Sequence, residues 1–229
     1  GWRVDGLTIG YVGLPDYKYG KYEAKQAFTE RLLERLANLP GVARAALAWS
    51  LPLWDFSSSN DFAVEGRPEP PPDKLPEMFY EPVTADYFET LGARLQQGRT
   101  FNSSDTTGHP NVVIINETTA HSYWPNESPI GRRISSSGKK REYYEIVGVV
   151  NDLAFPGDLG EPYTRYQAFV PVAQSAPSYL MLLMRTSSNP DALANSLRNT
   201  VAGLDPALPV YRIRTARAAV DQGLGSISL

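Results

Sequence analysis

Apolar residues follow two different periods in the N-terminal part of the chain. Residues 7–12 alternate in side-chain size and polarity, and this period of two predicts a strand. Residues 22–38 place apolar side chains four positions apart, which predicts an amphipathic helix: Ala24, Phe28, Leu32 and Leu36. Pro40 and Gly41 end that helix, and residues 42–49 return to a strand pattern. The stretch therefore predicts a strand–helix–strand unit of the split ferredoxin type.

The middle of the chain contains two short apolar runs without alternation. Residues 112–115 are all β-branched, and residues 146–150 are nearly so, which predicts two strands buried on both faces. Asn116 is suited to cap a helix that Pro125 ends, and residues 129–131 predict a turn. We expect four side chains from this region to be buried together: Ile115, Tyr123, Ile130 and Val147.

The segments around this centre give weaker patterns. Strands are predicted near residues 62–64 and at residues 78–83, followed by a short helix that Gly92 closes. Residues 67–76 contain five prolines, which favour an extended linker without packed structure. Further on, residues 168–172 and 179–184 predict strands.

The C-terminal part resembles the beginning in outline. Asn189 and Pro190 have the preferences of the first positions of a helix, whose apolar stripe runs to Leu204, and residues 209–213 predict the closing strand. Both this helix–strand join and the one at residues 36–42 contain proline. The repeat indicates either internal pseudo-symmetry or the general likeness of such joins.

These elements predict an α+β fold in which both ends of the chain build one domain. We expect residues 1–60 and 165–229 to form this discontinuous domain. Residues 61–164 are then an inserted, smaller subdomain of mixed β structure.

Several short motifs, in this order and spacing, resemble a known family. They are VTADYF at residues 83–88, QGRTF at 97–101, VIINE at 113–117, YWP at 123–125, PIGRRI at 129–134 and EIVGVV at 145–150. The ordered set resembles the MacB-like periplasmic core domain of FtsX-like ABC-transporter permeases, and looks closest to the large bacterial permeases without a fused ATPase. The resemblance implies a porter-like domain from the two chain ends and an inserted Sabre-like subdomain.

The resemblance also implies a location and partners. The domain would lie in the periplasm, between two helices of a bacterial inner-membrane protein. Its partners would be a separate ABC ATPase subunit, a periplasmic adaptor protein and a second copy of the full-length protein. In that family the domain does no catalysis and transmits motion of the membrane helices, which is called mechanotransmission.

Composition limits the alternatives. A net charge of −3 provides no basic field, so we expect no nucleic-acid partner. The chain has no cysteine, which excludes disulfides and thiolate metal sites. No apolar run reaches the roughly 20 residues that a membrane helix needs, and residues 1–5 do not resemble a signal peptide.

The sequence offers little for catalysis. His109 and His121 are the only histidines, and no serine-nucleophile or phosphate-loop motif occurs. Asp152 follows a buried strand, but we interpret it as a turn or capping residue because no partner base stands near it in sequence. We therefore expect no catalytic residue, no cofactor and no metal site.

Two groups of residues are candidate partner contacts. Arg132, Arg133, Lys139 and Lys140 form a local basic patch that would suit an acidic partner, although a solvated hairpin tip explains it more simply. Trp54 and Phe56 lie in a serine-rich loop, where they form either an exposed contact surface or a cap on the core.

The function that fits best is the extracytoplasmic domain of a permease that couples ATP-driven helix motion to export or extraction. The alternative is a free periplasmic module that binds a ligand in the cleft between its subdomains. An enzyme is disfavoured because no catalytic constellation is present.

Overall fold

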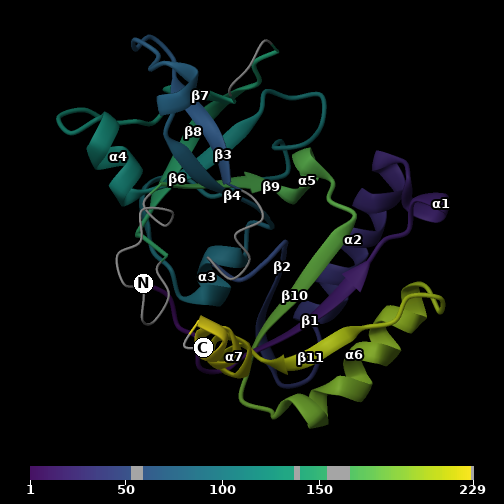
Figure 1. The fold of residues 1–229 in the computed structure, drawn as a ribbon. Coiled ribbons are helices and arrows are strands. Elements are labelled where there is room, and N and C mark those ends of the chain that lie inside the picture. Colours follow the sequence, from purple (N-terminus) through teal and green to yellow (C-terminus); the bar gives the residue numbers. More distant parts are fainter. Residues whose placement is uncertain (53–58, 137–139, 154–165, 228–229) are drawn as a thin grey trace. The chain divides into compact units, whose positions relative to one another are not determined.

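The computed structural model describes residues 1–52, 59–136, 140–153 and 166–227 (Figure 1). Trp54, Phe56 and Lys139 lie outside these residues. The chain forms two compact units. We name residues 2–54, 86–92 and 176–229 the terminal unit, and residue 1 with residues 55–85 and 93–175 the barrel unit. The predicted α+β class is confirmed, since both units combine helices with strands.

The terminal unit contains four strands in the order β11-β1-β10-β2, each antiparallel to its neighbour (Figure 1). Their bounds are Leu7–Gly13 for β1, Val42–Ala48 for β2, Tyr179–Thr186 for β10 and Tyr211–Thr215 for β11. Strand β10 lies between β1 and β2, and β1 lies between β10 and β11. The unit therefore holds two interleaved strand–helix–strand elements, as the patterns at both chain ends predict.

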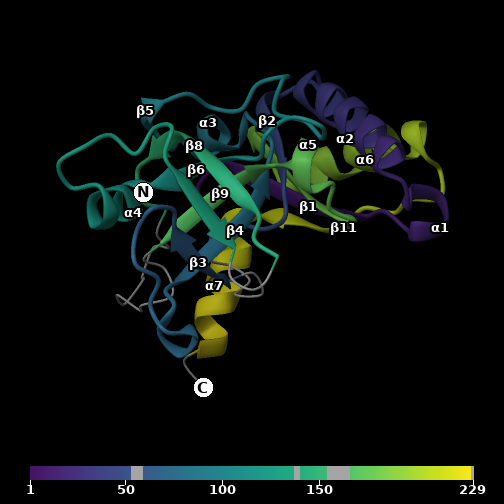
Figure 2. The ribbon, with the colours of Figure 1, turned by 90° about the horizontal axis from the view of Figure 1, so that it is seen from above.

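Helix α2 connects β1 to β2 along the chain, and helix α6 connects β10 to β11. The two helices pack against each other and lie together on one face of the sheet (Figure 2). The helices of the unit are α1 (Asp16–Tyr19), α2 (Tyr22–Ala37), α3 (Tyr87–Leu91), α6 (Pro190–Leu204) and α7 (Ala216–Ile227). The Ala192 N–H donates to the Asn189 side chain at 2.8 Å, which confirms the predicted cap of α6. Helix α7 contacts β1 and β11 and has no counterpart in the sequence prediction.

Six strands of the barrel unit close into a ring in the order β4-β3-β7-β8-β6-β9, and β9 pairs with β4 in parallel. Strands β6 and β8 are also parallel, and the other neighbours in the ring are antiparallel. The bounds are β3 Ser59–Val64, β4 Glu77–Val83, β6 Val112–Asn116, β7 Arg133–Ser136, β8 Tyr143–Val150 and β9 Gln167–Pro171. Closure leaves no edge strand in the ring.

Short elements complete the barrel unit. These are β5 (Leu95–Gly98), which pairs with β8, a 3-10 turn (Pro72–Lys74), α4 (Glu117–Tyr123) and α5 (Val172–Ser175). The 3-10 turn corrects the expectation of a wholly extended linker at residues 67–76, because three residues there curl into a hydrogen-bonded turn in which Lys74 N–H donates to Pro71 O.

The burial expected for the central region is met in full at two of four positions. Ile115 and Val147 are buried, and Tyr123 packs against the core while partly exposed. The prediction for Ile130 is wrong, since this side chain is 38% exposed. Ile130 precedes Gly131, which has a φ of +86°, in a turn closed by the Arg132 N–H on Pro129 O at 3.0 Å. A central turn position points its side chain outward, and Gly supplies the positive φ.

Candidate functional site

The central motif of the chain forms a buried hydrogen-bond centre. Asn116 Oδ1 accepts from the Thr119 N–H at 3.3 Å, from Thr119 Oγ1 at 2.5 Å and from the Gln167 N–H at 3.1 Å. Asn116 thus caps α4, as predicted, and also joins β6 to β9. Its amide contacts both main-chain N–H groups and the side chains of Thr119 and Asp152, so this buried polar group is hydrogen-bonded at the end of its strand.

Asp152 belongs to the same centre. Its carboxylate accepts from Asn116 Nδ2 at 2.6 Å, from the Thr118 N–H at 3.1 Å and from Thr118 Oγ1 at 2.5 Å. These contacts satisfy donors in the first turn of α4, where a negative charge is favourable. The capping interpretation of Asp152 is therefore supported.

The two histidines do not meet. His121 is exposed on α4, and exposed His109 lies in a loop with Nδ1 3.3 Å from Thr106 Oγ1. Within the described ranges, no three residues among His, Cys, Asp and Glu are grouped so as to hold a metal ion.

The arginines of the basic patch are held by ion pairs. Arg132 Nη2 lies 3.1 Å from Glu127 Oε2, and Arg133 Nη2 lies 2.5 Å from Glu65 Oε2. The Arg133 guanidinium also lies over the Tyr143 ring at 4.8 Å. Lys140 is exposed. Of the three described residues of the patch, Arg132 and Arg133 thus have their charges balanced by glutamates.

A different arginine forms a dense contact in the terminal unit. The Arg185 guanidinium donates to Thr90 O from Nη2 at 2.6 Å and from Nε at 3.0 Å, to Asp5 O at 2.5 Å and to Arg3 O at 2.9 Å. It therefore ties residues 3–5, which lead into β1, to the C-terminal end of α3. Burial and the nearby Arg3 charge lower the pKa of Arg185 from its usual range.

The two ends of the terminal unit are also tied to each other. Arg217 Nε, in the first turn of α7, lies 3.0 Å from Asp5 Oδ1, and Arg217 Nη2 lies 3.2 Å from Asp5 Oδ2. The Thr186 N–H donates to Gly6 O at 2.9 Å, and the Arg3 N–H donates to Leu91 O at 2.7 Å. The segments before β1 and at the start of α7 thus lie side by side.

The sequence patterns do not predict this arrangement, which we name the lead clamp: Arg3, Asp5, Thr90, Arg185 and Arg217. One available signal is that Arg185 directly follows a fully apolar run in β10, where a charge requires partners. Those partners are main-chain carbonyls, which leave no mark in an amino-acid sequence.

The chain is similar to known proteins in both sequence and fold. The model of the MacB-like periplasmic core domain matches residues 7–200. The macrolide export ATP-binding/permease protein MacB of Aggregatibacter actinomycetemcomitans is 29% identical over 87 residues. That match covers 37% of this chain and 13% of that protein, so the chain spans a small part of its curated relative.

Two solved structures share the fold. The periplasmic region of MacB from Actinobacillus actinomycetemcomitans has a TM-score of 0.59 at 15% identity, covering 97% of this chain and 94% of that chain. The extracellular domain of the noncanonic ABC-type transporter YknZ from Gram-positive bacteria has a TM-score of 0.52 at 17% identity, covering 90% and 100%. No helix in the described part of the chain is long and apolar enough to span a membrane. With most of its length matched by the family model, this chain belongs to the MacB-like periplasmic core domain family.

Proposed function

We propose that this domain couples ATP-driven motion of membrane helices to export or extraction work outside the bacterial inner membrane. The observation that supports the proposal is the lead clamp. It joins residues 3–5 and the start of α7 to β10, and Arg185 alone contributes four hydrogen bonds to it. Force applied at either segment would reach the sheet through short, charge-assisted contacts.

The strands behind the clamp are suited to this role. Strands β1 and β10 pair from Leu7 to Gly13, and the β10 residues from Leu180 to Met184 are fully buried. Buried, hydrogen-bonded strands open only at a high free-energy cost, so they move as a body. In this proposal the terminal unit corresponds to the porter-like domain at residues 1–60 and 165–229, and the barrel unit to the Sabre-like subdomain at 61–164.

The partners follow from the family. We propose a separate ABC ATPase subunit, a periplasmic adaptor protein and a second copy of the full-length permease. The adaptor or second copy would contact the loop with Trp54 and Phe56 and the patch with Lys139 and Lys140. Arg132 and Arg133 would join this contact by leaving their ion pairs with Glu127 and Glu65 and pairing with carboxylates of the partner.

A linker insertion tests the coupling. About six Gly and Ser residues placed after Ile227 in the full-length permease form a flexible coil that cannot carry directed displacement. Transport or resistance in cells should be lost while protease resistance shows a folded domain. The same linker between exposed Thr107 and Gly108 is the control and should be tolerated. Normal transport with the linker after Ile227 would refute the proposal.

A further inference from the structure

The ring of the barrel unit forms a partly open cavity of about 380 Å³. All six strands contribute to its lining, mostly through alternate residues of each strand. Four strands each contribute two alternate residues: Asn60 and Phe62 on β3, Met78 and Tyr80 on β4, Ile134 and Ser136 on β7, and Ala168 and Val170 on β9. The lining also includes Val113 on β6, Tyr144 on β8 and Glu142, which directly precedes β8. Alternate strand residues share one face, so these positions point into the ring. The volume falls near the lower end of the roughly 300–1,000 Å³ of ligand pockets.

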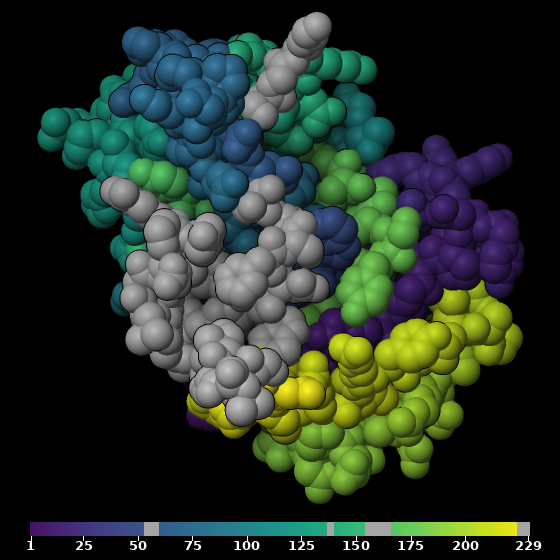
Figure 3. All heavy atoms as spheres, in the orientation of Figure 1, coloured from purple at the N-terminus to yellow at the C-terminus, as the bar shows by residue number. Residues whose placement is uncertain are grey.

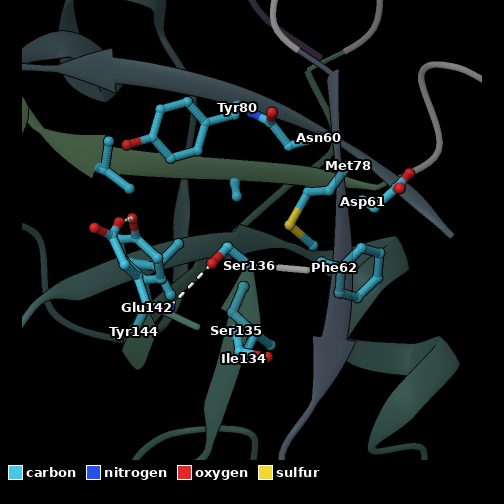
Figure 4. Close-up of a pocket in the computed structure, with 13 residues that line it drawn as sticks. Asn60, Asp61, Phe62, Met78, Tyr80, Ile134, Ser135, Ser136, Glu142 and Tyr144 are labelled. Carbon is cyan, nitrogen blue, oxygen red and sulfur yellow. Dashed lines mark hydrogen bonds between the residues drawn. The ribbon is translucent and has the colours of Figure 1, made fainter. Parts of the chain in front are cut away.

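The cavity has an apolar floor. Phe62, Met78, Val113, Ile134 and Val170 are all buried and belong to the hydrophobic core of the unit. Figure 4 shows Met78 and Phe62 together on one side of the space. This surface would accept an apolar group and offer no hydrogen-bonding partner to a polar one.

The opposite side is polar. In Figure 4 the side-chain oxygens of Tyr80, Tyr144 and Glu142 lie together. The Tyr144 hydroxyl donates to Glu142 Oε2 at 3.0 Å. Burial is the main cause that raises the pKa of both tyrosines, so each keeps its proton at neutral pH.

Among the described lining residues, Glu142 is the carboxylate on this polar side, and it is exposed to solvent. No described residue donates to its Oε1 atom, which leaves one carboxylate oxygen available at the mouth. Of the neighbouring charges, Arg141 is paired with Glu69, Lys140 is exposed on the adjoining turn, and Asp61 lies on the other side of the cavity (Figure 4).

From this geometry we propose that the barrel cavity binds a small amphipathic amine. Its apolar group would lie against Met78 and Phe62, and its ammonium group would donate to Glu142. The tyrosine rings add a favourable electrostatic surface for a cation. The site lies within one unit, so it is distinct from a cleft between subdomains, and it does not depend on the proposed coupling.

The test uses the 229-residue chain and three probes of similar size: 2-phenylethylamine, 2-phenylethanol and 3-phenylpropanoate. Titrations followed by amide chemical shifts report both affinity and location. The amine should bind with a Kd at least about tenfold below that of the alcohol, because only the ammonium group can form a charge-assisted contact with Glu142. The anion should bind most weakly. Shifts should concentrate on β3, β4, β8 and β9.

Matched variants distinguish binding in the cavity from binding elsewhere on the surface. Glu142→Gln should abolish the preference for the amine, while Glu145→Gln, three residues along and exposed, should leave it unchanged. Tyr144→Phe should weaken amine binding, and Tyr143→Phe should not. Ala168→Leu should block all three probes by filling space. Thermal unfolding of each variant verifies that it is folded.

Three results would reject the proposal. One is equal affinity for amine and anion, and another is an amine preference that survives Glu142→Gln in a folded protein. The third is the absence of shifts in the lining residues at about 10 mM probe, since even small ligands with good contacts bind at millimolar concentration.

Discussion

At the scale of single residues, the polar side chains with the most contacts act on the main chain. Arg185 donates only to carbonyl oxygens, and Asp152 and Asn116 accept from N–H groups of α4. Side chains used in this way fix the positions of backbone segments.

Gly98 in the QGRTF motif provides a first prediction. It has a φ of +71°, and a Cβ there would lie 2.1 Å from Val147 O. Gly98→Ala should therefore separate β5 from β8 and lower the free energy of unfolding by at least about 1–3 kcal/mol. Gly13→Ala is the control, because a Cβ at Gly13 has no neighbour within 4 Å. Equal chemical denaturation midpoints for the two variants would contradict the prediction.

Asp205 provides a prediction about pH. Its buried carboxylate accepts from Tyr19 Oη at 2.5 Å and from the Ala207 N–H at 3.0 Å, and lies 2.8 Å from Lys18 Nζ. The hydrogen bonds from Lys18 and Tyr19 lower the pKa of Asp205 from 3.8 to about 2. Because the folded pKa is the lower one, the unfolded state binds the proton first as pH falls. The stabilisation is complete above the unfolded value and is lost as pH falls toward about 2.

Asp205→Asn should accordingly cost about 1–3 kcal/mol at neutral pH. The difference from the wild type should shrink in urea unfolding experiments between about pH 4 and pH 2. The exposed Asp73→Asn serves as the control and should show a small effect throughout. A difference that stays constant over this pH range would show that the carboxylate charge is not the cause.

At the scale of elements, buried strands stabilise both units, and the lead clamp adds contacts between segments of the terminal unit. Ile115 on β6 is fully buried in the core of the barrel unit, while Lys140 is exposed beside β8. Ile115→Ala should lower the free energy of unfolding by about 2–5 kcal/mol, since it removes buried methyl groups and leaves a cavity. Lys140→Ala should change it by less than about 0.5 kcal/mol. Calorimetric melting curves measure both, and similar shifts would contradict the assignment.

The lead clamp predicts a local effect. Arg185→Met should leave the carbonyls of Thr90, Asp5 and Arg3 without their donor, at a cost of at least about 2 kcal/mol. Amide hydrogen exchange should rise at residues 3–6 and 90–92 and stay unchanged in the barrel unit. Arg44→Met removes a largely exposed ion pair with Glu89 and should cost below about 1 kcal/mol. Uniform exchange changes over the chain would rule out a local clamp.

At the scale of the whole molecule, a coupler should depend on connection more than on any one exposed polar group. In the full-length permease, Ala substitutions at His109, His121 and Arg133 should each leave most transport intact. Arg185→Met should reduce transport at temperatures where the domain stays folded. A cell-based transport assay with protease digestion measures both properties. Loss of transport in a folded His109 or His121 variant would instead indicate a ligand site at that residue.

Local features of the fold were predictable from the amino-acid sequence. The buried strands at residues 112–115 and 146–150, the caps at Asn116 and Asn189, and the helix end at Gly92 agree with the structure. In each case the decisive interaction lies within a few residues along the chain, or depends only on whether a side chain is apolar.

Only the tertiary structure decided features that depend on distant neighbours. The parallel β4–β9 pairing that closes the ring joins residues far apart in sequence, and the exposure of Ile130 follows from a turn that packs beside Gly98. The partners of Arg185 are carbonyl oxygens, which every residue possesses, so composition cannot reveal them. Sequence therefore determined which segments become strands and helices, while three-dimensional packing decided which main-chain groups and cavity walls those segments bring together.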